Sequence, residues 1–316
     1  MHLACAQGLA IKRYFREYKM KAVIYCQLQH DLPECLWSSL KKTRELWEGD
    51  IYLIAPARER AYKILKDLNI KVVAREEIKH HLIDDYLKHT FFPALYPEWD
   101  GFWDNACKRF PYILALMEMF GIDEAFHVEN DVVVYLDIEK MFKECKRVYG
   151  DKIVFTPHEY HHLNCGFTYF GSRPTIFCEQ IVNYFKRGVE WFRSAYPDDP
   201  IINETLFTYL FALESPQFVG KFPALPTDTE YKDLGFLVDP DGWGRLVDGV
   251  RYEPGKPFVV ERHYIGHEIL AGRYNVQWGA NIQSGKMVPV VTEKGKESMF
   301  ELATLHFNSK RSWLWI

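Results

Sequence analysis

The sequence of 316 residues lacks a long hydrophobic run, a paired cysteine motif and an excess of positive charge. Its longest apolar stretches, 111–121 and 205–213, fall short of the roughly 18 residues that a membrane-spanning helix needs. The seven cysteines are scattered and form no Cys-x-x-Cys pair, so they indicate neither a disulfide framework nor a zinc knuckle. With 39 basic and 43 acidic residues, the chain lacks the basic surplus that general nucleic-acid binders use.

The N-terminal region also lacks the order of a secretory signal. In residues 1–21 a short apolar run comes first and basic residues follow, which is the reverse of a signal peptide. Neither an internal repeat nor a Gly/Ser-rich linker divides the chain. These features predict a cytoplasmic protein with free thiols and a single domain over residues 1–316.

What the sequence has in quantity is aromatic side chains. Phe, Tyr and Trp make up 16% of the residues, within a composition of 48% apolar and 26% charged residues that is typical of a globular protein. Part of this excess must fill the core. The rest suits a protein that binds flat-faced ligands such as bases and sugar rings.

The first half alternates short β-rich apolar runs with segments of helical spacing. A capping box at Asp31–Glu34 predicts the start of the first helix. Such alternation predicts a parallel sheet with helices on both faces and a ligand site beyond the carboxyl ends of its strands. The expected strands are 22–26, 51–55, 70–74 and 125–128 with a continuation at 132–135, and the expected helices are 36–47, 58–68 and 108–120.

The second half has a different pattern. Two helices are expected at 174–196 and 201–213, and the region after Gly220 is rich in Gly, Pro and Trp. Short β runs at 258–260, 288–292 and 304–307 predict a small sheet with loops, lying over the strand ends.

The sharpest chemical feature is the triplet Glu129-Asn130-Asp131, which follows an apolar strand. Two carboxylates one residue apart at a strand end can project into the same crevice. Hard oxygen ligands of this kind suit Mg²⁺ or Mn²⁺ beside a substrate phosphate. The alternative is an acidic turn between two strands.

The surroundings of this triplet resemble the nucleotide-sugar-dependent glycosyltransferases of the GT-A fold, whose acid-x-Asp motif holds a divalent metal against the donor diphosphate. The helix before it, with Phe102-Trp103 and Arg109-Phe110, is similar to the family helix whose arginine faces the donor. Glu129 stands where the name-giving motif has Asp and still supplies a carboxylate.

Three later segments fall in the order that the resemblance requires. His162–Phe167 is similar to the family's Asn-x-Gly strand, through Asn164 and Gly166. The segment 198–204 is similar to an acidic, Asn-containing helix start that faces the sugar. The segment 304–310 is similar to the C-terminal histidine segment that closes over the diphosphate.

The resemblance implies a GT-A, Rossmann-like fold with a nucleotide-binding half at 22–135 and an acceptor-binding half at 136–316. It implies a hexosyl- or pentosyltransferase that uses Mn²⁺ or Mg²⁺, a nucleoside-diphosphate sugar (with a UDP-sugar favoured) and a glycan acceptor. The implied metal ligands are Glu129, Asp131 and His306. Asp199, with Asp198 as the alternate, is the expected catalytic carboxylate near the anomeric carbon. It would act as a base if the configuration is inverted, and as a nucleophile or a stabiliser of the oxocarbenium-like state if it is retained. The expected donor-binding residues are Tyr25, Gln27, Arg58, Arg109, Asn130, Asn164, Gly166 and Lys310, and the expected acceptor-binding residues are His158, Trp243 and Tyr264.

Several alternatives remain open at this point. A sugar nucleotidyltransferase on a similar sheet would carry a glycine-rich phosphate loop, and residues 26–31 contain no glycine. An inactive carbohydrate-binding relative would not need both Asp131 and His306. The run 158–162, with three histidines and a glutamate, has the ligand types of a zinc site. The turn-rich segment 239–244 is either a plain loop or a lid whose Trp243 stacks on a sugar.

Overall fold

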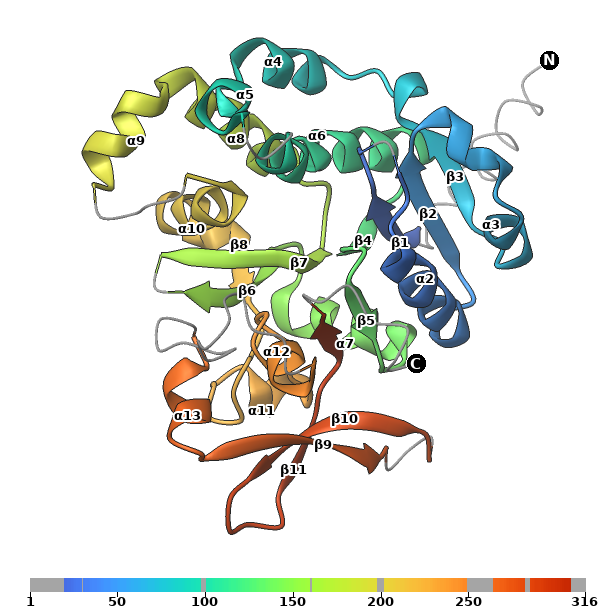
Figure 1. Ribbon diagram of the computed structural model, residues 1–316, viewed down its shortest axis with the longest axis vertical. Helices are drawn as coiled ribbons and strands as arrows, with labels where there is room; N and C mark the ends of the chain where they lie inside the picture. Colours follow the sequence, from blue (N-terminus) through green and yellow to red (C-terminus); the bar gives the residue numbers. More distant parts are fainter. Residues whose placement is uncertain are drawn as a thin grey trace, which may run out of the picture.

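A computed structural model describes residues 20–29, 31–97, 101–159, 161–197, 202–248, 264–281 and 285–307. Its centre is a seven-stranded sheet in the order β3-β2-β1-β4-β7-β6-β8 (Figure 1). Neighbouring strands run parallel except β7, which is antiparallel to both β4 and β6. The predicted α/β class with a mostly parallel sheet is therefore confirmed. The strands are β1 (Lys21–Cys26), β2 (Asp50–Ala55), β3 (Lys71–Ala74), β4 (Glu124–Val128), β6 (Ile153–Glu159), β7 (His162–Phe170) and β8 (Val219–Lys221).

The central strands are buried because both faces of the sheet are covered. In β1, Val23 and Tyr25 belong to the core on one face, whereas Ala22 and Ile24 belong to the core on the other. All four side chains are fully buried. This explains why the strand reads as a continuous apolar run without polar alternation.

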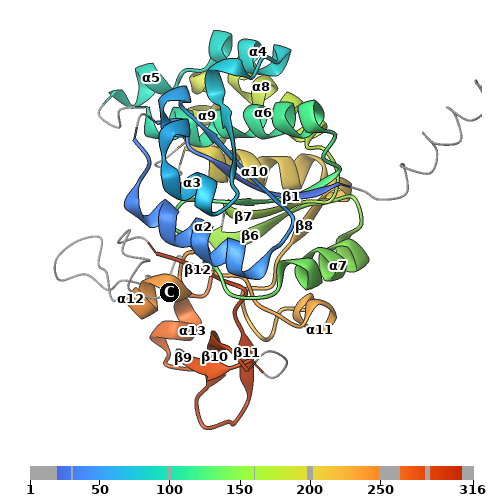
Figure 2. The same ribbon diagram turned by 90° about the vertical axis from the view of Figure 1, so that its right-hand side faces the viewer.

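Two layers of helices cover the sheet (Figure 2). Helices α2 and α7 pack on one face, and α4, α6, α8 and α10 pack on the other. The bounds of these helices are α2 (Glu34–Leu46), α4 (His81–His89), α6 (Phe102–Phe120), α7 (Ile138–Tyr149), α8 (Thr175–Arg187) and α10 (Glu204–Glu214). The shorter helices are α3 (Lys63–Asp67), α5 (Phe92–Leu95), α9 (Val189–Ala195), α11 (Tyr231–Leu234), α12 (Trp243–Asp248) and α13 (Gly266–Leu270).

Two smaller sheets complete the fold. Strands β9 (Tyr274–Ala280), β10 (Met287–Glu293) and β11 (Met299–Glu301) form an antiparallel sheet at the bottom of Figure 1. Strand β12 (Thr304–His306) leaves this sheet and pairs with β5 (Val132–Val134). The chain thus returns at its end to the acidic triplet that precedes β5. The strand expected at 258–260 lies outside the described residues.

Some local expectations were wrong. Helix α2 begins after Pro33 without a side-chain cap, so Asp31 forms no capping box. The helix expected over 58–68 is a 3₁₀ turn (Ala57–Ala61) followed by the short α3. The long helix expected at 174–196 is divided at Gly188, whose φ of 78° lies in a region that favours glycine. Strand β5 pairs with β12 and does not extend β4.

Candidate metal and donor site

The acidic triplet lies at the carboxyl end of β4, where the sheet also presents the end of β1. The backbone N–H of Glu129 donates to the carbonyl of Gly166 on β7 (2.8 Å), which fixes the start of the triplet against the sheet. The side-chain amide of Asn130 donates to Oε1 of Gln27, just beyond β1 (2.5 Å). The ends of two parallel strands therefore meet at one polar site, as strand topology predicts.

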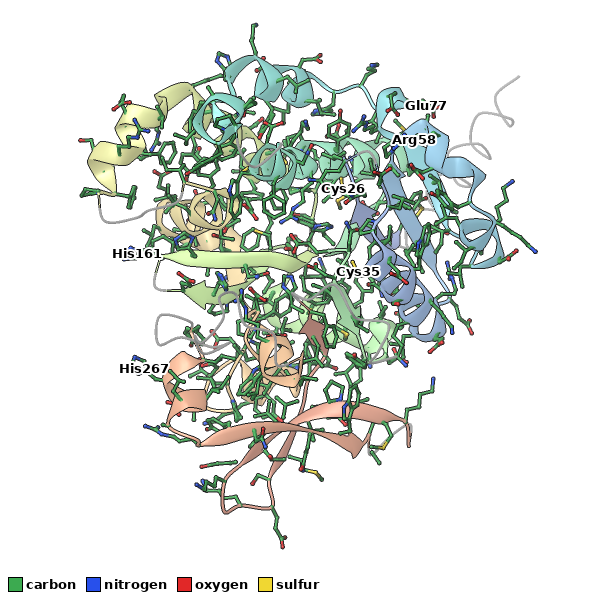
Figure 3. All side chains as sticks on the ribbon, viewed as in Figure 1. Cys26, Cys35, Arg58, Glu77, His161 and His267 are labelled. Atoms are coloured by element: carbon green, nitrogen blue, oxygen red, sulfur yellow. The ribbon has the colours of Figure 1, made fainter. Side chains whose placement is uncertain are left out.

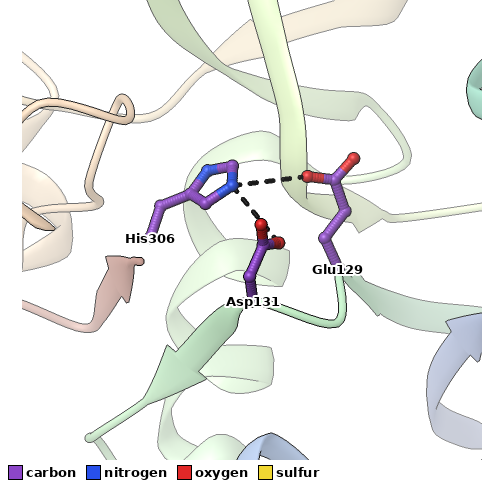
Figure 4. Close-up of side chains that lie close together, drawn as sticks. All are labelled: Glu129, Asp131 and His306. Atoms are coloured by element: carbon purple, nitrogen blue, oxygen red, sulfur yellow. Dashed lines mark ion pairs between the residues drawn. The ribbon is translucent and has the colours of Figure 1, made fainter. Parts of the chain in front are cut away.

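Strand β12 brings a histidine to this site. Its antiparallel register places His306 opposite Val132, the residue after Asp131, and the N–H of Phe307 donates to the carbonyl of Asp131 (2.8 Å). As a result His306 Nε2 lies 3.3 Å from Asp131 Oδ1 and 3.7 Å from Glu129 Oε2 (Figure 4).

Glu129, Asp131 and His306 together have the geometry of a metal site. One ligand atom from each lies within 4.8 Å of the others. Two carboxylates and an imidazole form a donor set that suits Mn²⁺ and accepts Mg²⁺. No other group of three or more His, Cys, Asp or Glu side chains in the described ranges is arranged in this way.

The charges at the site act strongly on one another. Burial by itself lowers the pKa of His306, but the carboxylates of Asp131 and Asp241 outweigh this effect and raise the pKa to about 10. Burial raises the pKa of Glu129, but the positive charges of Arg109 and His306 outweigh it and hold that pKa below its ordinary value. The carboxylates thus stabilise positive charge on His306, and Arg109 and His306 stabilise negative charge on Glu129.

Arg109, on helix α6, connects this cluster to the neighbouring core. One guanidinium nitrogen, Nη1, is ion-paired with Glu129 Oε1, and Nη2 lies 3.9 Å from Glu204 Oε1. The side chain is 8% exposed, and its Nε and Nη2 have no hydrogen-bond partner among the described residues. Arg109 thus retains donor capacity at the site.

The Asn-x-Gly segment of β7 forms the wall beside the metal ligands. Asn164 Oδ1 accepts the N–H of Gly166 (2.6 Å). A Cβ atom added at Gly166 would lie 2.9 Å from both Asn164 Oδ1 and Glu129 Oε2, and 3.2 Å from His306 Cε1. Only glycine leaves room for the side chains of Glu129 and His306 to pack this closely against the backbone of β7.

Two of the residues expected at the site have buried side chains that face the core. Tyr25 is fully buried, and its hydroxyl bonds to Ser39 Oγ (2.8 Å) and Thr43 Oγ1 (2.7 Å). Trp243 is also fully buried, and its Nε1 donates to the carbonyl of Ala224 (3.0 Å). We therefore correct two expectations. Tyr25 does not face a donor and Trp243 does not form a sugar-stacking lid, because both rings pack in the core.

The remaining expected donor and acceptor residues lie in several places. Arg58 is ion-paired with Asp31 (2.9 Å) and Glu59 (3.0 Å) on the surface beyond β2. His158 and Tyr264 lie together, since the N–H of Tyr264 donates to the carbonyl of His158 (2.7 Å). Asp198, Asp199 and Lys310 lie outside the described residues.

The zinc site considered for residues 158–162 is not assembled in the described part of this segment. His158 Nδ1 is hydrogen-bonded to the carbonyl of Pro240 (2.9 Å), and His162 Nδ1 to Thr205 Oγ1 (2.6 Å). His161 lies at the outer edge of the molecule (Figure 3). These rings point to different partners and share no centre.

Three functional candidates were missed by the sequence analysis. Glu204 is buried beside Arg109, and its Oε2 has no hydrogen-bond partner among the described residues. Burial raises its pKa to about 7 against the lowering effect of Arg109. Asp239 and Asp241 both approach His306. The available signal was modest: Glu204 is the last residue of the acidic helix start 198–204, and both aspartates lie in the turn-rich segment 239–244.

No protein-family model and no curated protein matches this chain. Among solved structures it is similar to mouse xyloside xylosyltransferase 1, with 13% identity over 68% of this chain and 91% of that one and a TM-score of 0.43. It is also similar to the galactosyltransferase LgtC in complex with donor and acceptor sugar analogues, with 12% identity over 67% of this chain and 82% of that one and a TM-score of 0.41. A third similar structure is core-mannan synthase A from Aspergillus fumigatus in a Mn/GDP form, with 11% identity over 65% of this chain and 73% of that one and a TM-score of 0.43. The structural neighbours thus include glycosyltransferases, the class that the motifs resemble.

The helices give no sign of a membrane span. Over the described ranges, none of them combines the length and the apolar character that crossing a bilayer requires.

Proposed function

We propose that this protein is a metal-dependent glycosyltransferase that moves a sugar from a nucleoside-diphosphate sugar, with UDP as the favoured nucleotide, to an acceptor hydroxyl of a glycan. The observation that carries the proposal is the convergence of Glu129, Asp131 and His306 at a strand end, with Arg109 bound to the same carboxylate cluster. An isolated acidic turn would recruit neither a histidine from β12 nor a buried arginine from α6.

The donor set supports a divalent cation at these three residues. When bound there, Mn²⁺ or Mg²⁺ would offset the charge of the diphosphate and stabilise its departure from the sugar. Arg109 would add fixed positive charge and donate from Nε and Nη2, which have no hydrogen-bond partner in the described ranges. Its ion pair with Glu129 holds these groups in place before the donor arrives.

The walls of the site suit a sugar nucleotide. Gly166 lets the proposed metal ligands Glu129 and His306 pack directly against the backbone of β7, and Asn164 fixes that backbone. The Gln27–Asn130 contact joins the ends of β1 and β4, where a nucleotide would lie. In this proposal residues 22–135 hold the nucleotide, whereas residues 136–316 provide the acceptor side.

The remaining roles are proposed from the motif resemblance. Asp199, with Asp198 as the alternate, would supply the carboxylate near the anomeric carbon. Lys310 would neutralise the leaving diphosphate. His158 and Tyr264 would contact acceptor hydroxyls, and their shared backbone hydrogen bond supports placing them in one wall.

The proposal is tested by a thermal-shift screen of UDP-, GDP- and TDP-sugars with and without Mn²⁺. We expect one nucleotide to raise the melting temperature only when Mn²⁺ is present, and Asp131→Ala to abolish that shift. Turnover would then be shown by hydrolysis of the same nucleotide sugar, measured as the nucleoside diphosphate that is released. If no nucleotide sugar changes the melting temperature, the proposal is wrong; binding without turnover would indicate an inactive relative.

A further inference from the structure

The carboxylate of Asp239 joins two segments that are distant in the sequence. Its Oδ1 accepts the N–H groups of Gly242 (2.8 Å) and Trp243 (2.9 Å). Its Oδ2 accepts those of Gly244 (2.7 Å) and His306 (2.8 Å). The residue is only 4% exposed, so these four hydrogen bonds are formed out of water, where losing one is costly.

The segment held by Asp239 lies directly against the backbone of His306. A Cβ atom added at Gly244 would be 2.0 Å from the carbonyl oxygen of His306. From the same segment, Asp241 Oδ1 lies 3.9 Å from His306 Nδ1, and Asp241 Oδ2 accepts from Arg245 (2.5 Å). Thus residues 239–245 contact both the main chain and the ring of this histidine.

The opposite side of His306 is held much less extensively. Strand β12 has only three residues, and it pairs with the three-residue β5. One hydrogen bond continues this ladder past His306, from the N–H of Phe307 to the carbonyl of Asp131 (2.8 Å), and so short a ladder gains from a further fixed element. Asp239 supplies that element, and Thr304 Oγ1 accepts the N–H of Asp239 (3.2 Å).

We propose that Asp239 is a positioning residue that fixes His306 as the third metal ligand. The segment 239–245 is then part of the metal centre and not a lid over the sugar. This inference rests on the proposed metal site. Groups that orient metal ligands without touching the metal typically contribute about 10–100-fold to metal affinity.

The first test measures Mn²⁺ affinity by electron paramagnetic resonance of free Mn²⁺ in titrations of the full chain. Asparagine at position 239 keeps one acceptor oxygen and replaces the other with a donor, so Asp239→Asn should weaken Mn²⁺ binding about 10–100-fold. The matched control is Asp228→Asn, because Asp228 also accepts two backbone N–H groups, of Ala224 and Leu225, without contacting a metal ligand. Equal Mn²⁺ affinity in Asp239→Asn and the wild type would overturn the proposal.

The second test needs no metal. In wild-type protein labelled with ¹⁵N-histidine and treated with a chelator, the His306 amide should exchange slowly with solvent, and Asp239→Asn should speed that exchange at least tenfold. The signal is assigned with His306→Gln. Rapid exchange in the wild type would overturn the proposal even if Asp239→Asn did not fold. Slow exchange in a wild type that fails to bind Mn²⁺ would instead show that the metal site is wrong while the contact between Asp239 and His306 is real.

Discussion

His306 Nε2 lies 3.3 Å from Asp131 Oδ1 because the register of β12 on β5 places the histidine opposite the residue that follows the aspartate. The contact thus depends on β12, the last strand among the described residues, lying beside the acidic triplet that contains Asp131. It makes Asp131 the ligand held closest to His306, and it makes the proposed metal site sensitive to changes in either residue.

Removing the Asp131 carboxylate should therefore abolish tight metal binding. Loss of a direct ligand should cost more than the roughly 10–100-fold that an outer partner contributes, so we expect Asp131→Ala to weaken Mn²⁺ affinity by about 100-fold or more. Isothermal titration with Mn²⁺ measures this directly.

The control for this change is Asp137→Ala. Asp137 caps α7 by accepting the N–H of Lys140 (2.8 Å), so its loss should cost about 1 kcal/mol of stability but leave Mn²⁺ affinity unchanged. Equal affinities in Asp131→Ala and the wild type would show that the cluster does not hold the metal.

Gly166→Ala should disturb the same site through crowding. Its Cβ atom would come within 2.9 Å of Glu129 Oε2 and 3.2 Å of His306 Cε1, so at least one metal ligand must move. We expect Mn²⁺ affinity to fall by about tenfold or more, in the range seen for lost outer partners. Gly279→Ala serves as the comparison, because the atoms nearest to its Cβ would belong to Val290 on β10 and Met299 on β11, away from the metal ligands. A Gly166→Ala protein with unchanged Mn²⁺ and nucleotide-sugar affinity would contradict the proposed wall.

Glu204 should make stability depend on pH. Burial raises its folded-state pKa from 4.5 to about 7, so between these pH values the folded protein binds the proton more tightly than the unfolded chain. Wild-type stability should consequently fall as pH rises through this window. Glutamine resembles the protonated acid, so Glu204→Gln should gain stability over the wild type from pH 5 to pH 8, up to about 3 kcal/mol.

Urea unfolding of both proteins at pH 5 and pH 8 measures this gain. Glu190→Gln, at an exposed position on α9, is the control and should give no comparable change between the two pH values. A constant difference between Glu204→Gln and the wild type across the window would show that Glu204 is charged throughout.

The sequence predicted the scaffold well for a physical reason. Continuous apolar runs such as 22–26 and 51–55 are what strands covered on both faces require, and the intervening helices follow from their spacing. Local features were harder, because a single glycine at position 188 or a proline at position 33 changes how a helix begins or ends.

The site was predicted in part. Motif order singled out Asp131, Arg109 and His306, whereas no local pattern could show that Asp239 would bind the N–H of His306. That contact depends on tertiary packing of two distant segments. The resemblance implied a donor contact for Tyr25, but the direction of its ring is set by α2, which supplies both of its hydroxyl partners.

Tyr25→Phe tests that correction. Removing the hydroxyl leaves Ser39 and Thr43 without this partner inside the core, which should cost about 1–2 kcal/mol in the free energy of unfolding. Because the ring is fully buried, the affinity for the nucleotide sugar should not change. Gln27→Ala, just beyond the same strand, should weaken nucleotide-sugar binding and cost less stability than Tyr25→Phe. Urea unfolding and a nucleotide-sugar titration on both variants measure the two effects, and a Tyr25→Phe protein of unchanged stability but weakened binding would return this tyrosine to the donor site.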